Sequence, residues 1–134
     1  PGRYHHCDTG VPHLVIPVDD IEAVDPAAAG PPLRFHDRFA PAGLNVDWVA
    51  RDPGGVRWRL RTYERGVEAE TLACGTGAAA AATVLVSLGL ASSPVAVATM
   101  GGDLLHVDVD LDRRRLRLRG PARVAFEGEV ASDD

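Results

Sequence analysis

The chain has 134 residues, of which 46% are hydrophobic, and it carries a formal net charge of −5. This length and composition indicate one globular domain with its own core and exclude a disordered chain. The acidic balance disfavours nucleic acid or a membrane surface as a partner, and because all 14 basic residues are arginine, chemistry that needs a lysine is excluded.

Short strands and irregular segments alternate in the first half of the chain. We expect strands over residues 13–18, 45–50 and 57–63, because these runs are apolar or alternate between apolar and polar residues. Residues 25–32 are rich in alanine, proline and glycine, which predicts a loop or a frayed helix. We expect residues 35–42 to be irregular.

A strongly apolar run over residues 77–88 predicts a helix. It contains five consecutive alanines and shows no polar face, and Gly89 after it is typical of a helix C-terminus. A helix that is apolar on every side has to be enclosed, and its alanines let a surrounding sheet approach closely.

The last third of the chain predicts further strands. We expect one over residues 95–99, a hairpin formed by residues 105–111 and 115–119, and a last strand over residues 124–126, followed by a frayed tail over residues 131–134. The elements together predict an α+β fold, with a mostly antiparallel, barrel-like curved sheet wrapped around one central apolar helix.

One cysteine, Cys74, lies in a turn of small residues directly before the apolar helix. Unpaired N–H groups and the helix dipole favour negative charge at a helix N-terminus, so we expect this thiol to ionise more easily than a free cysteine. The backbone N–H groups around Gly75 and Thr76 offer a place for a carboxylate beside it. The alternative is an inert, buried structural cysteine. A Walker-type phosphate loop is disfavoured because it requires a lysine.

The segment Tyr63-Glu64-Arg65-Gly66 ends the strand before this turn. It is either an ordinary exposed ion pair or a clamp for an amino acid, in which Arg65 binds a carboxylate and Glu64 accepts from an ammonium group. We expect Glu68 and Glu70 to be solvated charges.

No metal site and no disulfide framework are expected. The run His5-His6-Cys7-Asp8 contains metal-binding residue types but has no partner cluster at a usable spacing. Two cysteines are too few for a framework, so reduced thiols in a cytoplasmic protein are expected. No segment is long enough to span a membrane.

Taken together, these stretches resemble diaminopimelate epimerase, specifically its C-terminal half. The matching stretches follow the family's order over nearly the whole chain: residues 9–15, 44–49, 62–67, 70–78, 101–104 and 120–122. Glu64-Arg65-Gly66-Val67 combined with Glu70-Thr71-Leu72-Ala73-Cys74-Gly75-Thr76-Gly77-Ala78 is highly specific.

The resemblance implies an enzyme of two similar lobes, each a barrel-like sheet around a central helix. Residues 1–134 would then be a single domain, the C-terminal lobe, with the N-terminal lobe absent from this chain. The implied reaction inverts one α-carbon of diaminopimelate, from LL to meso, in lysine and peptidoglycan precursor biosynthesis. Two cysteines act from opposite faces of that carbon, without pyridoxal phosphate or metal. The implied partners are the amino-acid substrate, the N-terminal lobe and a second copy in a homodimer.

The resemblance also implies a role for each candidate site residue. Cys74 is one of the two catalytic cysteines, and the backbone of Gly75 and Thr76 holds the reacting carboxylate. Arg65 and Asn45 read the distal, non-reacting centre of the substrate. Two further implied roles complete the site: Glu64 binds an ammonium group or tunes Cys74, and His13 lies near the opposite cysteine.

Two departures from the family pattern leave alternatives open. Val11 stands where the family often has asparagine, so one hydrogen bond at the distal centre is either missing or supplied by another residue. The second cysteine belongs to the absent lobe, and Cys7 cannot replace it, because it lacks a following Gly-Asn and precedes a strand rather than a helix. The alternatives are a lobe of a related racemase acting on proline or another amino acid, and a non-catalytic binding or dimerisation lobe.

Overall fold

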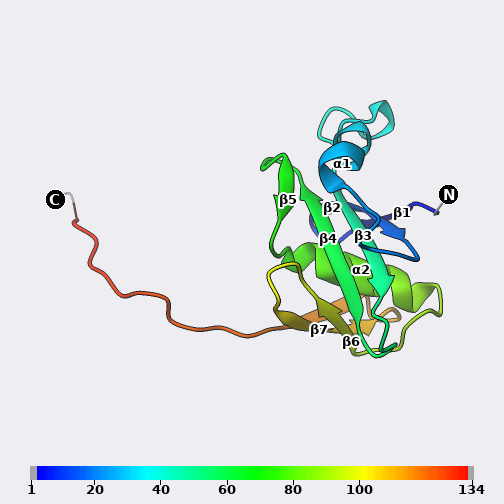
Figure 1. The fold of residues 1–134 in the computed structure, drawn as a ribbon. Helices are drawn as coiled ribbons and strands as arrows, with labels where there is room; N and C mark the ends of the chain where they lie inside the picture. The colour runs from blue at the N-terminus through cyan, green and yellow to red at the C-terminus, as the bar shows by residue number, and fades with distance from the viewer. Residues whose placement is uncertain (1–2, 133–134) are drawn as a thin grey trace.

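Eight strands and two α-helices make up the fold in the computed structural model, which describes residues 3–132 (Figure 1). The elements, in chain order, are β1 (His5–Asp8), β2 (Pro12–Pro17), α1 (Pro26–Arg34), a 3-10 turn (Asp37–Phe39), β3 (Asn45–Arg51), β4 (Trp58–Glu64), β5 (Ala69–Thr71), α2 (Gly75–Ser87), β6 (Val95–Ala98), β7 (Leu104–Asp110) and β8 (Arg115–Arg119).

All eight strands belong to one curled sheet. Its strand order is β1-β2-β3-β4-β6-β7-β8, and β5 pairs with β4 beside this path. The β2–β3 and β4–β6 pairs are parallel and the remaining pairs are antiparallel. The predicted α+β class, with a mostly antiparallel, barrel-like sheet, is confirmed.

Helix α2 fills the inside of the curl, as its apolar composition predicts. It contacts every strand of the main path, from β1 to β8, and the five alanines Ala78–Ala82 are all buried. Small side chains let the strands approach the helix on all sides, so Leu85, Val97 and Val107 complete a tightly closed inner core. Gly89 (φ +71°) ends the helix in the left-handed conformation expected of it.

A second core covers the outer face of β2, β3 and β4. Helix α1 packs there, and the residues expected to be a loop or frayed helix are an ordered helix. The side chain of Asp25 accepts hydrogen bonds from the N–H groups of Ala27 and Ala28, and Pro26 occupies the first turn, where a missing N–H costs nothing. Gly30 lets the helix approach Tyr63, since a Cβ atom there would lie 2.4 Å from the Tyr63 ring.

The structure departs from the sequence expectations at several chain segments. Strands β1 and β5 were not expected, and α2 begins at Gly75 rather than residue 77. The prediction of a strand over residues 124–126 is wrong. Residues 120–132 have no regular structure and run away from the sheet (Figure 1), leaving Val124 and Phe126 79% and 86% exposed. A short apolar run forms a strand only where a neighbouring strand pairs with it, and no strand within residues 3–132 pairs with residues 124–126. The frayed tail expected over residues 131–134 lies partly outside the described residues.

Candidate active site

Cys74 is the N-cap residue of α2. Its backbone is extended (φ −138°, ψ 107°), and its Sγ accepts a hydrogen bond from the N–H of Gly77 at 3.3 Å. A sulfur atom therefore takes the position that a serine or aspartate oxygen usually has at a helix start. Thr76 lies inside the first turn instead of capping the helix, and its hydroxyl is 3.5 Å from Cys74 Sγ.

The half-buried thiol opens into a groove of about 510 Å³. The groove is lined by Thr9, Glu64, Ala73, Cys74, Gly75, Thr76, Ala79, Leu116 and Leu118. Four predicted site residues, Cys74, Gly75, Thr76 and Glu64, therefore meet in one place, and Leu116 and Leu118 of β8 form an apolar wall opposite them. Cys74 is half-buried rather than fully buried.

A chain of buried hydrogen bonds lies directly beneath this groove. His13 Nδ1 is 2.6 Å from Asp47 Oδ2, and His13 Nε2 is 3.0 Å from Thr76 Oγ1. The second oxygen of Asp47 accepts from the Thr62 hydroxyl at 2.6 Å. His13 and Asp47 are 0% exposed and Thr62 is 2% exposed. Together with the Thr76–Cys74 contact, these bonds join four elements, β2, β3, β4 and α2.

The parallel pairing of β2 with β3 positions the histidine and the carboxylate. His13 lies opposite Asn45 in the register, so Asp47 is one alternation further along the same inner face. Asp47 and Thr62 face each other across β3 and β4. His13 is expected from the sequence to have a supporting role, whereas Asp47 and Thr62 are site residues that the sequence does not predict. The available signal was the alternation of Asn45 and Asp47 with apolar residues, which places two polar groups on a buried face.

Burial raises the pKa of the Cys74 thiol above its ordinary value, and the negative charges of Asp47 and Glu64 act in the same direction. Hydrogen bonds from Thr76 and from the N–H of Gly77 act in the opposite direction without cancelling the effect of burial. The expectation that Cys74 ionises more easily than a free cysteine is therefore wrong for this chain. Loss of water around the sulfur outweighs the donors of the helix N-terminus.

Asn45, Arg65 and His13 do not line the groove. Asn45 is buried, and its Oδ1 accepts from the backbone N–H of Arg65 at 2.7 Å, which holds the turn after β4. The Arg65 guanidinium donates to the carbonyl of Gly43 at 3.4 Å. Val11 offers no side-chain hydrogen bond, and its carbonyl accepts from the N–H of Thr9.

Glu68 and Glu70 are both paired; Glu68 is exposed as expected, whereas Glu70 is half-buried, which corrects the expectation that it is a solvated charge. Glu70 forms a two-pronged pair with Arg61, with both N···O distances 2.7 Å. Glu68 accepts from Arg34 at 2.9 Å and from the N–H of Gly66 at 2.7 Å. The Arg34–Glu68 pair ties the turn between β4 and β5 to α1, and the Arg61–Glu70 pair joins β4 to β5, so these carboxylates have structural partners.

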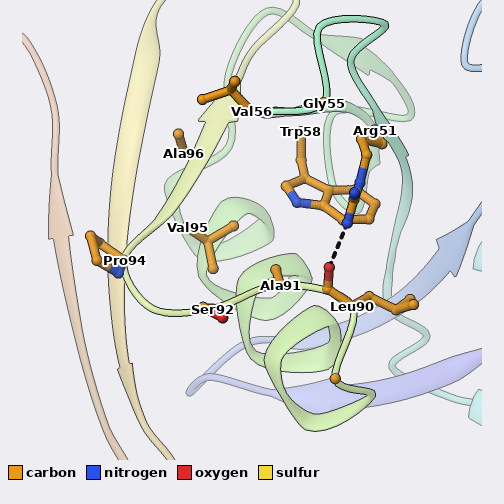
Figure 2. Close-up of a pocket in the computed structure, with 11 residues that line it drawn as sticks. Arg51, Gly55, Val56, Trp58, Leu90, Ala91, Ser92, Pro94, Val95 and Ala96 are labelled. Carbon is orange, nitrogen blue, oxygen red and sulfur yellow. Dashed lines mark hydrogen bonds between the residues drawn. The ribbon is translucent and has the colours of Figure 1, made fainter.

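A second pocket, of about 250 Å³, lies at the far end of α2 (Figure 2). The guanidinium of Arg51 lies over the Trp58 ring, 5.0 Å from its centre, and donates to the carbonyl of Leu90 at 2.8 Å. Arg51 is the one charged residue that lines this pocket, and the lining offers the hydroxyl of Ser92 no His, Asp, Glu or Cys as an acid–base partner. The pocket therefore offers less chemistry than the groove at Cys74.

Two features are absent from residues 3–132, the part of the chain that the structure describes. Within that range, no group of three or more His, Cys, Asp or Glu side chains is arranged to hold a metal ion. None of the helices described there has the length and apolar character needed to cross a membrane.

Comparison with known proteins gives consistent matches. The family model described as diaminopimelate epimerase matches residues 6–124. The diaminopimelate epimerase of Gemmatimonas aurantiaca is 49% identical over 132 residues, which cover 91% of this chain and 47% of that protein. The corresponding protein of Aquifex aeolicus is 44% identical, over 94% of this chain and 45% of its own length. The chain thus spans about half the length of these relatives.

One solved structure supports the fold. The Bacillus anthracis phenazine biosynthesis protein of the PhzF family aligns with a TM-score of 0.55 at 15% identity, covering 89% of this chain and 38% of the other. At this level of identity the match concerns the fold alone.

Proposed function

Because the chain belongs to the diaminopimelate epimerase family, we propose that it is one lobe of an enzyme that inverts an α-carbon of diaminopimelate between the LL and meso forms. The observation that carries this proposal is the position of Cys74. Its sulfur caps α2, accepts from Gly77 N–H at 3.3 Å, and opens into a groove that Glu64, Gly75 and Thr76 also line.

Cys74 acts as acid and base in this proposal. As a thiolate it takes the α-proton on one face of the carbon, and as a thiol it delivers a proton to that face in the reverse direction. The raised pKa of Cys74 favours the protonated thiol in the lobe on its own. A proton donor requires this protonated form. A second cysteine, supplied by the N-terminal lobe, acts on the opposite face.

The N-terminus of α2 binds the carboxylate on the reacting carbon. The N–H groups of Gly75 and Thr76 belong to the first turn, where backbone donors have no partner within the helix. Their hydrogen bonds stabilise the negative charge that develops as the α-proton leaves. Closure of the second lobe over the groove removes water and strengthens these contacts.

Three further residues recognise the rest of the substrate. Glu64 lines the groove beside Cys74 and accepts from an ammonium group. Arg65 binds the distal carboxylate after turning from its present contact with Gly43. Asn45 contributes through its hydrogen bond to the backbone of Arg65, which fixes the turn that presents the guanidinium.

Exchange of the substrate α-proton in deuterated water tests the proposal. The chain alone should give no exchange on LL-diaminopimelate, because a single thiol cannot serve both faces. The chain mixed with the N-terminal half of a full-length relative should restore exchange. In that complex Cys74→Ser should abolish inversion and Cys7→Ser should leave it unchanged. Normal turnover by Cys74→Ser would refute the assigned role. If proline rather than diaminopimelate competed for the groove, the lobe would belong to a different racemase.

A further inference from the structure

The turn between β1 and β2 brings a polar residue to the groove at Cys74. Thr9 is half-buried and lines the groove, whereas Val11, in the same turn, is not among the lining residues and has no polar side chain. The acid–base chemistry proposed for Cys74 does not use the Thr9 hydroxyl. Thr9 is therefore a polar group of the groove that still lacks a function.

The backbone of this turn is held by several contacts. Asp8 Oδ1 accepts from the N–H of Gly10 at 2.8 Å. The N–H of Thr9 donates to the carbonyl of Val11 at 3.2 Å. Antiparallel pairing of β1 with β2 anchors both ends of the turn, with Asp8 opposite Pro12. Thr9 is therefore held at the edge of the groove, and little conformational freedom is lost when a ligand binds to it.

The Thr9 hydroxyl is available to a ligand. The one hydrogen bond that it forms with residues 3–132 is to the carbonyl of Val11 at 3.5 Å, well beyond the roughly 2.5–3.0 Å of an ordinary O–H···O bond. By contrast, the Thr76 hydroxyl contacts both His13 Nε2 at 3.0 Å and Cys74 Sγ at 3.5 Å. Thr9 can therefore donate to a bound group without breaking a strong hydrogen bond.

The other polar groups of the groove define what Thr9 adds to it. Glu64, as a carboxylate, only accepts hydrogen bonds and therefore suits an ammonium group. In the proposed function, the N–H groups of Gly75 and Thr76 bind the carboxylate on the reacting carbon. Thr9 adds an uncharged donor to this set. A substrate with two amino-acid centres has a second carboxylate that can accept from it.

Asn45 connects the turn that carries Thr9 to the turn that carries Arg65. Asn45 Nδ2 donates to the carbonyl of Pro12 at 3.4 Å, and Asn45 Oδ1 accepts from the backbone N–H of Arg65 at 2.7 Å. One side chain thus joins the two turns at the same end of the sheet. A carboxylate offers about four lone-pair positions, so a guanidinium and a hydroxyl can bind it together. These contacts associate Thr9 with Arg65 rather than with the helix donors at the reacting centre.

We propose that the Thr9 hydroxyl donates a hydrogen bond to the distal carboxylate of the substrate and thereby selects a ligand with two amino-acid centres. The inference rests on the proposed function, because it takes diaminopimelate as the ligand. Thr9 has no part in the proton transfer. Its hydrogen bond is the same in the bound substrate and in the transition state, since the distal centre does not change during the reaction.

L-Lysine provides the test, because it is diaminopimelate without the distal carboxylate. Binding of L-lysine and of LL-diaminopimelate to the chain is measured by NMR titration. Thr9→Val keeps the shape and removes the hydroxyl, so its affinity for diaminopimelate should fall about tenfold, as expected for one lost hydrogen bond to a charged group. Its affinity for L-lysine should not change. Thr9→Ser is the matched control and should retain the preference for diaminopimelate.

Two results of these titrations would overturn the proposal. An equal loss for both ligands in Thr9→Val would place Thr9 at the part of the ligand that they share, and unchanged binding of diaminopimelate would remove Thr9 from recognition. Circular dichroism verifies the fold of both variants. If Thr9→Val does not fold, the unsubstituted chain decides the point. Diaminopimelate should then shift the amide signal of Thr9 more than L-lysine does, and equal shifts or no shift would overturn the proposal.

Kinetics of the two-lobe complex give a second readout. A hydrogen bond of equal strength in the ground state and the transition state contributes to KM, so the loss in Thr9→Val should appear in KM rather than in kcat. A loss confined to kcat would place Thr9 in the chemical step and would contradict its role at the distal centre.

Failure of this inference and failure of the epimerase assignment are distinguishable. If Thr9→Val leaves the preference between the two ligands unchanged, the effect of Cys74→Ser on proton exchange still tests the assignment. If the two-lobe complex gives no exchange, the preference of the chain for diaminopimelate over L-lysine still tests Thr9 as a binding residue.

Discussion

Gly77 faces the carboxylate of Asp47 so closely that a Cβ atom added to the glycine would lie 2.6 Å from Asp47 Oδ1. The same added atom would lie 3.2 Å from Thr62 Oγ1 and 3.3 Å from Cys74 Cβ. The second glycine of the Cys-Gly-Thr-Gly turn therefore exists for close packing, because it brings the start of α2 onto the buried polar chain. The thiol and its support depend on the same missing side chain.

Gly77→Ala should consequently destabilise the protein by about 1–3 kcal/mol, the usual cost of forcing an extra methyl group into a packed interior. The added methyl group meets a carboxylate held by two hydrogen bonds, which cannot move without losing one of them. Urea unfolding measures the change. Gly54→Ala is the matched control, because a Cβ atom there meets nothing within 4 Å. Equal stability of the two variants would contradict the packing role.

Arg61→Met should lower the free energy of unfolding by about 3 kcal/mol, the order expected when one partner of a shielded ion pair is removed. The guanidinium holds both oxygens of Glu70 and also donates to the carbonyl of Val24 at 2.7 Å. The side chains of Arg61 and Glu70 are only 15% and 26% exposed. Arg113→Met breaks the exposed pair with Asp110 and should change stability by less than about 0.5 kcal/mol. Similar losses in the two variants would show that shielding is unimportant here.

Asp25→Ala should cost about 1 kcal/mol in urea unfolding, because the side chain caps α1 through two backbone N–H groups. The helix needs this cap more than most, since Pro31 and Pro32 interrupt its internal hydrogen bonding. Asp25→Asn retains an accepting oxygen and should lose much less. Should both variants lose the same amount, charge at the helix start rather than hydrogen bonding would be responsible.

Stability should fall as the pH rises above the ordinary thiol value of 9.0, because burial raises the pKa of both Cys7 and Cys74 in the folded chain. The unfolded chain then loses its thiol protons first, so unfolding releases protons and the free energy of unfolding decreases with pH. This contribution is fully present below the unfolded pKa and disappears above the folded one. Urea midpoints across an alkaline pH series should decline less for Cys7→Ser, and least for the Cys7→Ser/Cys74→Ser double variant. Parallel declines in all three proteins would exclude the thiols as the cause.

Strong periodicity made much of the fold predictable. Helix α2 and the β7–β8 hairpin follow from local patterns, the uninterrupted apolar run of the one and the alternation of apolar with charged residues in the other, although Leu116 and Leu118 remain 40% and 45% exposed. Strand β1 was missed because His5-His6-Cys7-Asp8 has no apolar alternation, and its extended conformation depends on pairing with β2 and on packing against α2. The reverse error occurred at residues 124–126, where a short apolar run is present but no described strand lies beside it.

The candidate site was predictable where chemistry is written in a short motif, and not where it depends on tertiary contacts. Cys74, Gly75 and Thr76 are neighbours in the chain, so their meeting at a helix start could be anticipated. Asp47 meets His13 only because β2 and β3 run parallel in one particular register. The error over the ionisation of Cys74 has the same origin, since the loss of water around the sulfur depends on Leu116, Leu118 and other residues far along the chain.

Strand β3 lies between two cores, with Val49 packed on the inner side and Val46 and Trp48 on the outer side. Its central amides can meet solvent only if both layers separate, so we expect them to exchange hydrogen only through global unfolding. Asn45 and Asp47 are carried on this strand. The scaffold of the candidate site therefore belongs to the slowest-exchanging part of the protein, and partial opening elsewhere leaves its geometry intact.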